Sequence, residues 1–401
     1  MLLTIETPEL VIHQWSLFNF MEPEIFKDKE HSVFRKIVRN FVEEEIKPNA
    51  TNWEREKHFP VNLLSKFASK GFLGISLPTN VGGGEKDFWH EVVMAEELAR
   101  SRALGWALSI LVQSNMLAPL IFQLGTNEQK EKILMPALHG DFYLALAVTD
   151  PSSGSDLASI STTAILNGKN YVLNGEKRYI TNGSVARYYV VLARTETKKN
   201  IWSLGLFLVS SETKGLRNKK LDTVGLKTGD TASVVFTNCE ISKDSVLGDP
   251  TKGFLYLLRG LHRERLIGAV ALNALSLYVW EETLDFLKNR SRFNEPLVKK
   301  QVISHRMVEL RTTIEAARQF TYAVCDSFSK GEPVDKEILM LKVFCYENCQ
   351  KVIDECLHLH GGEGFLSDHW LSHARQDSQA FTLAAGSSEI IKDLLAGMLK
   401  M

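Results

Sequence analysis

The segment GFLYLLRGLHRERLIGAVALNALSLYVWEE occupies residues 253–282, and its apolar side chains recur at every third or fourth position. This spacing predicts a long amphipathic helix, about 60 Å in length if it continues to residue 292. Three later runs share the spacing and are joined by short connections: 299–330, 334–360 and 389–398. Long helices with short connections predict an antiparallel four-helix bundle over residues 251–401.

Two zones of different character precede this bundle. Residues 26–142 have helical spacing, and in HSVFRKIVRNFVEEEI it puts Val33, Ile37 and Phe41 on one apolar stripe. Residues 143–250 contain short runs of β-branched and aromatic residues, with turn-forming clusters and no helical segment between them. Such runs predict an antiparallel sheet or barrel and disfavour a nucleotide-binding βαβ unit.

The predicted fold class is therefore α+β, mostly α. It has an N-terminal helical domain, a middle β domain and a C-terminal four-helix bundle. Residues 1–25 form an N-terminal extension, which we expect on the domain surface. This extension is acidic through residue 24 and contains no Arg or Lys there, unlike a signal peptide or a mitochondrial presequence.

The composition excludes several classes of function. The formal net charge of −1 gives no overall field that would favour nucleic acid. The five cysteines are odd in number and form no C-x-x-C pair, which predicts reduced thiols in a cytoplasmic protein. No run approaches the roughly 18 uncharged apolar residues of a membrane span, so we expect no membrane partner. His369 and His373 lie four apart without an H-E-x-x-H sequence, and no metal site is expected.

A single carboxylate interrupts the apolar face of the helix predicted from residue 253. Stepping by three and four, that face contains Leu257, Leu261, Glu264, Gly268, Leu272 and Leu275. A carboxylate packed against apolar groups loses hydration, which raises its affinity for a proton and suits a general base. The alternative from spacing alone is a structural ion pair of Glu264 with Arg263, Arg265 or Arg318.

Several segments, in order, resemble motifs of the acyl-CoA dehydrogenase family. ALAVTDPSSGSDLASI and LNGEKRYITNGSVARYYVVLART are similar to its V-T-E-P-x-x-G-S-D and G-x-K-x-W-I-T-N-G segments. GLKTGDTASVVFTNCEISKDSVLGDPTKGF, KNRSRFNEPLVKKQ, LHLHGGEGF and AAGSSEIIKDLLA resemble later motifs. The resemblance covers the chain from about residue 26 onward. It implies the same three-domain order, non-covalent FAD, an acyl-CoA substrate, electron-transferring flavoprotein as acceptor and a homo-oligomer, either a dimer or a tetramer.

The family usually carries its catalytic glutamate in a Y-E-G-T motif, where this chain has Ala385. The long-chain and isovaleryl types instead carry it in an E-R-L sequence on the first bundle helix, which here is Glu264-Arg265-Leu266. The resemblance therefore implies that Glu264 removes the α proton of the thioester. The β hydrogen would leave as hydride to flavin N5, giving a trans-2-enoyl product.

The same resemblance assigns binding residues position by position. The cofactor residues implied in the middle domain are Leu146, Val148, Thr149, Gly154, Ser155, Tyr179, Ile180 and Thr181. Those implied in the bundle are Arg290, Phe293, Gln301, His358, Gly361, Gly362, Ser387 and Glu389, of which the first three would reach a neighbouring subunit's FAD. The implied substrate contacts are Ser155, Arg265, Ala385 and Gly386.

Other functions remain open from the sequence. The thioester carrier could be acyl carrier protein in a biosynthetic pathway, or the enzyme could be an oxidase that passes electrons to oxygen. A flavin-free scaffold is a third alternative, against which the retained TDPSSGSD loop and Glu264 both speak. The small residues Ala384, Ala385 and Gly386 predict room for longer or β-branched acyl chains.

Overall fold

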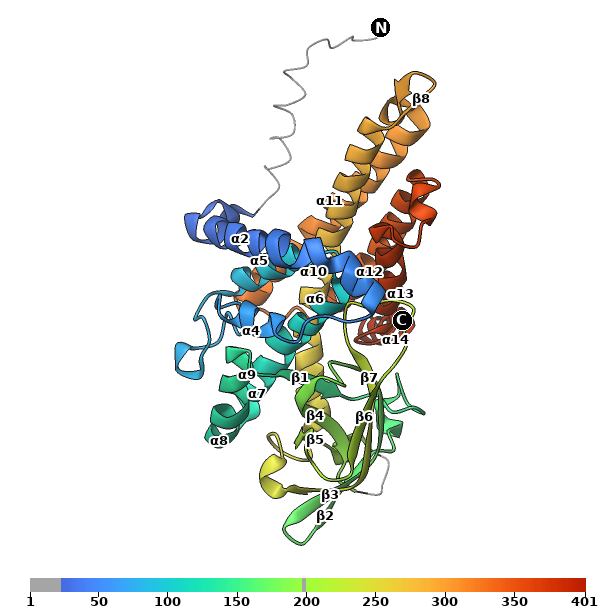
Figure 1. The fold of residues 1–401 in the computed structure, drawn as a ribbon. Helices are drawn as coiled ribbons and strands as arrows, with labels where there is room; N and C mark the ends of the chain where they lie inside the picture. Colours follow the sequence, from blue (N-terminus) through green and yellow to red (C-terminus); the bar gives the residue numbers. More distant parts are fainter. Residues whose placement is uncertain (1–22, 197–199) are drawn as a thin grey trace.

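The computed structural model describes residues 23–196 and 200–401, so most of the predicted extension, 1–25, lies outside the described residues. Figure 1 shows N-terminal helices packed on the C-terminal bundle, with the strands of the middle domain at one end of the molecule. This is the mostly α, α+β arrangement predicted from the three zones, and the fold class is confirmed.

The N-terminal domain consists of short helices interrupted by π- and 3₁₀-helical turns. They are η2 (Glu24–Lys27), α2 (Lys29–Phe41), η3 (Val42–Ile46), η4 (Lys47–Asn49), α3 (Ala50–Glu56), α4 (Leu63–Ala68), η5 (Thr79–Val81), α5 (Phe88–Leu98), α6 (Leu104–Leu111), η6 (Val112–Leu117), α7 (Ala118–Leu124), α8 (Asn127–Gln129), η7 (Lys130–Leu134) and α9 (Met135–His139). Helix α5 begins where the Asp87 side chain accepts a hydrogen bond from the His90 N–H, which caps its first turn.

The apolar stripe predicted on α2 is wrong in part. Val33 and Ile37 are exposed, whereas Val38 and Phe41 are buried. The helix is turned so that Phe34 packs edge-on against Phe72, at 6.0 Å between ring centroids. Phe41 on the same face also packs edge-on against Phe72, so two aromatic contacts fix the orientation of the helix.

The prediction that no uncharged run approaches the length of a membrane span is also wrong. Leu104–Leu124 comprises 21 residues, is apolar enough by composition to cross a membrane, and runs through α6, η6 and α7. However, 72% of its apolar window is buried inside the protein. Its apolar side chains are therefore explained by packing in the protein core.

The middle domain is built on a seven-stranded sheet in the order β1-β4-β2-β3-β7-β6, with β5 paired to β4. The strands are β1 (Tyr143–Ala147), β2 (Thr163–Asn167), β3 (Asn170–Thr181), β4 (Ala186–Arg194), β5 (Leu204–Ser210), β6 (Leu216–Lys220) and β7 (Thr231–Ser242), and the 3₁₀ turns are η8 (Leu157–Ser159), η9 (Ile201–Ser203) and η10 (Lys243–Ser245). Antiparallel pairing holds for β2–β3, β3–β7, β4–β5 and β6–β7, but β1 and β4 are parallel. The long segment between β1 and β2 frees β1 from hairpin pairing, so the sheet is mixed.

The C-terminal domain is a bundle around α10 (Gly253–Asn289), an uninterrupted helix of 37 residues and about 55 Å. It continues through β8 (Ser291–Arg292), β9 (Glu295–Pro296), η11 (Leu297–Lys299), α11 (Gln301–Ser329), α12 (Asp335–Leu359), η12 (Glu363–Phe365), α13 (Trp370–Leu383) and α14 (Ser388–Met398). The sequence patterns predict no helix at α13. Its buried positions include His373, Asp377 and Ser378, so it has no continuous apolar stripe.

Candidate active site

Glu264 lies on α10 with its side chain partly buried. Among residues 23–196 and 200–401, it has neither a hydrogen bond nor an ion pair. The guanidinium groups that could have paired with it are engaged elsewhere: Arg263 with Glu91, Arg318 with Glu315, and Arg265 with the Ala385 carbonyl. The structural ion pair considered as an alternative is therefore not formed.

Burial and the neighbouring positive charges shift the pKa of Glu264 in opposite directions. Burial raises the pKa of the Glu264 carboxyl, and this effect outweighs the positive charges of Arg265 and Lys342, which lower it. A carboxylate with a raised pKa and no fixed partner keeps its lone pairs available to accept a proton. Glu264 therefore has the local chemistry of a general base.

Lys342 on α12 is a neighbour that sequence reasoning missed. Its side chain is fully buried, its Nζ donates to the Phe381 carbonyl at 2.7 Å, and the same atom lies 3.5 Å from the centroid of the Tyr346 ring. Burial lowers the pKa of Lys342 to about 7, although the Glu264 charge opposes the shift. A signal existed in the sequence, because a lone lysine interrupts the apolar run EILMLKVFCY.

The segment between α13 and α14 is hydrogen-bonded to α10 at the residue that follows Glu264. Arg265 Nε donates to the Ala385 carbonyl at 3.0 Å and so holds the loop against α10. Ala385 has φ +55° and Gly386 has φ +98°, and in the described residues the N–H groups of both are without a hydrogen-bond acceptor. A left-handed conformation is costly for alanine, and such strain is found where a backbone has a task. Two free N–H groups in this loop can donate to a carbonyl oxygen.

Two further predicted residues lie directly after this loop. Ser387 is the residue before α14, and Glu389 lies exposed in its first turn. Hydrogen bonds from the Glu389 N–H and from Ser387 lower the pKa of the Glu389 carboxyl. These contacts are local to the turn, so the geometry alone assigns neither residue to a ligand.

A buried ion pair joins the two motif segments of the middle domain. Lys177 Nζ on β3 lies 2.5 Å from Asp150 Oδ1, with both side chains fully buried, and donates to the Val148 carbonyl at 2.7 Å. One residue further along each segment, the Arg178 N–H donates to the Thr149 carbonyl at 2.8 Å. The loop after β1 is therefore held against the end of β3, although 27 residues of sequence separate Asp150 from Lys177.

The predicted flavin contacts of the middle domain lie on β1, in the loop after it and at the end of β3. We call the place where this loop meets β3 the Tyr179 junction. Tyr179 follows the bonded pair, with φ +61° and 63% of its surface exposed. Ile180 is buried, Leu146, Val148, Thr149 and Thr181 are partly buried, and Gly154 and Ser155 are exposed, with open space where a Gly154 Cβ would lie. An aromatic ring held exposed on strained backbone, beside accessible polar loop groups, fits the planar ring and phosphates of FAD.

The remaining predicted cofactor residues lie at the other end of the bundle. Figure 1 shows the β8 hairpin at the far end of α10 from the sheet. Arg290 lies 3.6 Å from the Glu363 carboxylate, near Gly361 and Gly362, where added Cβ atoms would meet open space. Phe293 is 93% exposed, and Gln301 and His358 are exposed. Within one chain, the structure does not bring these residues to the Tyr179 junction.

A cavity of 210 Å³ lies along α10, one turn before Glu264. Helix α10 contributes Tyr256, Arg259, Gly260 and Arg263, and η6 and α7 contribute the opposite wall. Glu264 is not among its lining residues, because successive helix residues point about 100° apart. The cavity therefore does not by itself define where the reaction occurs.

Comparisons with known proteins agree with this architecture. Residues 28–141, 145–239 and 251–399 match the N-terminal, middle and C-terminal domains of acyl-CoA dehydrogenase. The chain is 33% identical to a 3-(aryl)acrylate reductase of Clostridium sporogenes, covering 94% of this chain and all of the relative. It is 33% identical to the mitochondrial long-chain specific acyl-CoA dehydrogenase of Mus musculus, covering 92% of this chain and 86% of that one. The crystal structure of an acyl-CoA dehydrogenase from Geobacillus kaustophilus superimposes with a TM-score of 0.90 at 32% identity, over 93% and 99% of the two chains.

The chain belongs to the acyl-CoA dehydrogenase family. The resemblance predicted from the motifs is thereby confirmed, as are its consequences that the protein is an oxidoreductase and that its cofactor is FAD. Dehydrogenation of acyl-CoA is the reaction that the family supports in general.

Proposed function

We propose that this enzyme converts an acyl-CoA to its trans-2-enoyl thioester, with Glu264 as the base that removes the α proton. The observation that carries the proposal is the Glu264 carboxylate, which burial makes more basic and no described side chain neutralises by direct contact. Every cation near it is held by another group. Glu264 is therefore free to accept a proton from a substrate.

The neighbouring residues have separate tasks in this proposal. Arg265 fixes the 385–386 loop through the Ala385 carbonyl, so that the free N–H groups of Ala385 and Gly386 can bind the thioester oxygen. Donors directed at an oxygen that gains negative charge are worth several kcal/mol in a desolvated site. Loss of the α proton is thereby made easier at the moment Glu264 accepts it. FAD, when bound, supplies the hydride acceptor for the β hydrogen.

The test is an anaerobic titration of the FAD-loaded enzyme with a panel of acyl-CoAs, while bleaching of the flavin absorbance is followed. In Glu264→Gln we expect acyl-CoA binding to be retained and flavin reduction to be slowed by at least about 100-fold, since general bases contribute this much or more. Glu281→Gln is a matched control on the same helix, where Glu281 pairs with Arg100 at 3.0 Å. The control should bleach like the wild type. Normal bleaching in Glu264→Gln would place the base elsewhere.

The panel also tests the substrate class. The small side chains at 384–386 support longer or β-branched acyl groups, so turnover confined to four-carbon chains would contradict this part of the proposal. Acyl carrier protein thioesters, offered beside the CoA thioesters of the same acids, distinguish the two carriers. We propose CoA as the carrier and electron-transferring flavoprotein as the acceptor. Reoxidation by oxygen at the same rate as by that flavoprotein would favour an oxidase.

We also propose a homo-oligomer in the cytoplasm. Arg290, Phe293 and Gln301 lie in or next to the β8–β9 hairpin, which Figure 1 shows far from strand β3, where Tyr179 lies. Phe293 is almost fully exposed, which fits a residue that completes a neighbour's FAD site. All five cysteines are free and buried, as expected for a reducing compartment. Light scattering of the FAD-loaded enzyme tests the assembly. Arg290→Ala should weaken FAD retention, and a monomer that retains FAD fully would contradict this proposal.

A further inference from the structure

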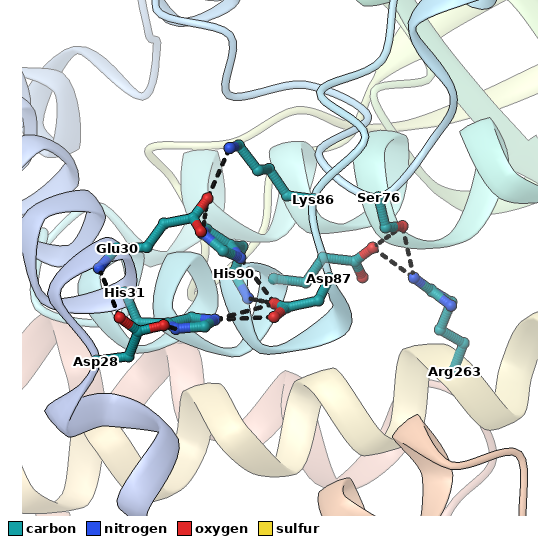
Figure 2. Close-up of polar contacts among 9 residues, drawn as sticks. Asp28, Glu30, His31, Ser76, Lys86, Asp87, His90 and Arg263 are labelled. Carbon is teal, nitrogen blue, oxygen red and sulfur yellow. Dashed lines mark hydrogen bonds and ion pairs between the residues drawn. The ribbon is translucent and has the colours of Figure 1, made fainter.

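Two histidines and an aspartate meet where α2 packs against the start of α5. Figure 2 shows the rings of His31 and His90 directed at the Asp87 carboxylate. His31 Nε2 lies 3.1 and 3.0 Å from the two Asp87 oxygens, and His90 Nδ1 lies 2.7 Å from Asp87 Oδ1. One ligand atom from each residue lies within 4.8 Å of the other two. Both histidines are almost fully buried, whereas Asp87 is about half exposed.

The far side of each ring faces a second carboxylate. His31 Nδ1 lies 3.7 Å from Asp28 Oδ2, and His90 Nε2 lies 3.7 Å from Glu30 Oε1. Metal-binding histidines have this arrangement, with one ring nitrogen on the metal and the other donating to a carboxylate. The arrangement occurs twice here, on opposite sides of the same aspartate.

We propose that His31, His90 and Asp87 form a site for a divalent transition-metal ion such as Zn²⁺. Two imidazoles and one carboxylate, with a water in the fourth position, are a ligand set that zinc accepts. Tetrahedral ligands about 2.0 Å from zinc lie about 3.3 Å from one another, so the histidine–Asp87 contacts need only small outward shifts. The half-exposed Asp87 leaves the fourth position open to solvent.

Without a metal ion, the hydrogen bonds of this cluster leave one nitrogen of each imidazole ring without a hydrogen-bond partner. A neutral imidazole carries one N–H. If each ring donates it to Asp87 through its inner nitrogen, the outer nitrogen on the far side of the ring is left buried without a hydrogen-bond partner. His31 Nδ1 and His90 Nε2 are both in this condition among the described residues. With a cation between the inner nitrogens and Asp87, the protons move to the outer nitrogens and face Asp28 and Glu30. Buried polar atoms are rarely left unpaired, so the bound state satisfies more groups.

The local charge also favours a cation. Asp28, Glu30 and Asp87 supply three carboxylates around the two rings. Among the described residues, the lysine or arginine paired with them is Lys86, whose Nζ lies 2.7 Å from Glu30 Oε1. The site joins two helices, because His31 lies on α2 and Asp87 caps α5. A bound ion would therefore fasten α2 to the helix that carries Glu91, the ion-pair partner of Arg263.

The test is calorimetric titration of Zn²⁺ into the FAD-loaded enzyme after chelator treatment and desalting. We expect one Zn²⁺ per chain and a rise in the midpoint of thermal unfolding. Asp87→Asn should lower the affinity by more than about 100-fold, and Glu30→Gln by about tenfold, as expected for an inner ligand and for its supporting carboxylate. Asparagine caps helices as well as aspartate does, so Asp87→Asn should remain folded.

His262→Gln is the matched control. His262 Nδ1 lies 2.7 Å from Asp335 Oδ1, a histidine–aspartate pair of the same chemistry without a second histidine. This variant should bind Zn²⁺ like the wild type. A wild type that takes up no Zn²⁺, an Asp87→Asn variant of unchanged affinity, or loss of binding in His262→Gln would each overturn the proposal. If the wild type takes up no Zn²⁺, the cluster joins α2 to α5 by hydrogen bonds alone.

Discussion

Glu264 and Glu91 are both carboxylates on helices beside Arg263, yet their surroundings differ completely. Glu91 is buried and accepts hydrogen bonds from Arg263, Ser76 and Asn115, the last at 2.7 Å. Glu264, one residue after Arg263, has no such partner in the described chain. Of the two carboxylates, only Glu91 is paired with this arginine, although Glu264 is its neighbour in sequence.

The comparison shows what separates a structural acid from a candidate base. A carboxylate saturated by a cation and two hydrogen bonds stays fixed in place, and its removal leaves the cation uncompensated. A carboxylate that is desolvated without direct partners gains basicity and remains accessible to a substrate. The predictions below test these two roles.

The largest effect is expected from Glu91→Gln. The substitution leaves the guanidinium of Arg263, whose side chain is 21% exposed, without its counter-charge, and should destabilise the fold by about 3 kcal/mol. The thermal unfolding midpoint of the holoenzyme measures this. Glu128→Gln, which breaks the exposed Glu128–Lys132 pair, is the control and should leave the unfolding midpoint nearly unchanged, because solvent screens such a pair. Equal effects of the two variants would mean that Glu91 is not the structural acid.

A smaller effect is expected from Lys342→Met. The Lys342 charge lowers the pKa of Glu264, so its removal should raise that pKa and move the acid limb of the kcat profile to higher pH. Because the pKa of Lys342 is about 7, the difference from wild type should be greatest below pH 7 and fade above it. Lys392→Met removes an exposed lysine paired with Glu347 at 2.6 Å and is the control. If the acid limb of the kcat profile does not move in Lys342→Met, the Lys342 charge does not affect the pKa of the catalytic base.

A pH-dependent effect on stability is expected from Asp377 on α13, a third buried carboxylate. It accepts a hydrogen bond from the Leu226 N–H, and burial raises its pKa from 3.8 to about 8. Folding therefore takes up a proton between these values, and stability should fall as pH rises through that window. Asp377→Asn should flatten this part of the dependence of the unfolding midpoint on pH. An unchanged slope in the variant would show that Asp377 is ionised in the folded protein.

The sequence was sufficient for those features that lie within one element. The 3.6-residue period predicted α10 and singled out Glu264 on it, because a long helix exposes its periodicity directly. It failed for α13, where the buried face carries His373, Asp377 and Ser378, and for the pairing of β1 with β4, which depends on a loop and not on local composition. Local patterns do not encode such tertiary choices.

The candidate active site was likewise predictable only where its residues lie within one segment of the sequence. Family motifs indicated the 148–155 loop and the 179–181 strand end, but not the buried Asp150–Lys177 pair that joins them. Lys342 reaches the Glu264 region from another helix, and His31 meets Asp87 across 56 residues. These contacts exist only once the helices are packed. No spacing rule within one segment could have identified them.

The most direct test of Glu264 as the base separates proton removal from hydride transfer. The enzyme is kept reduced under anaerobic conditions, so that the hydride cannot leave, and is incubated with a saturated acyl-CoA in D₂O. Mass spectrometry then follows deuterium entering the α carbon. We predict exchange in the wild type and in Glu281→Gln, and none in Glu264→Gln. Exchange at the wild-type rate in Glu264→Gln would contradict the assignment.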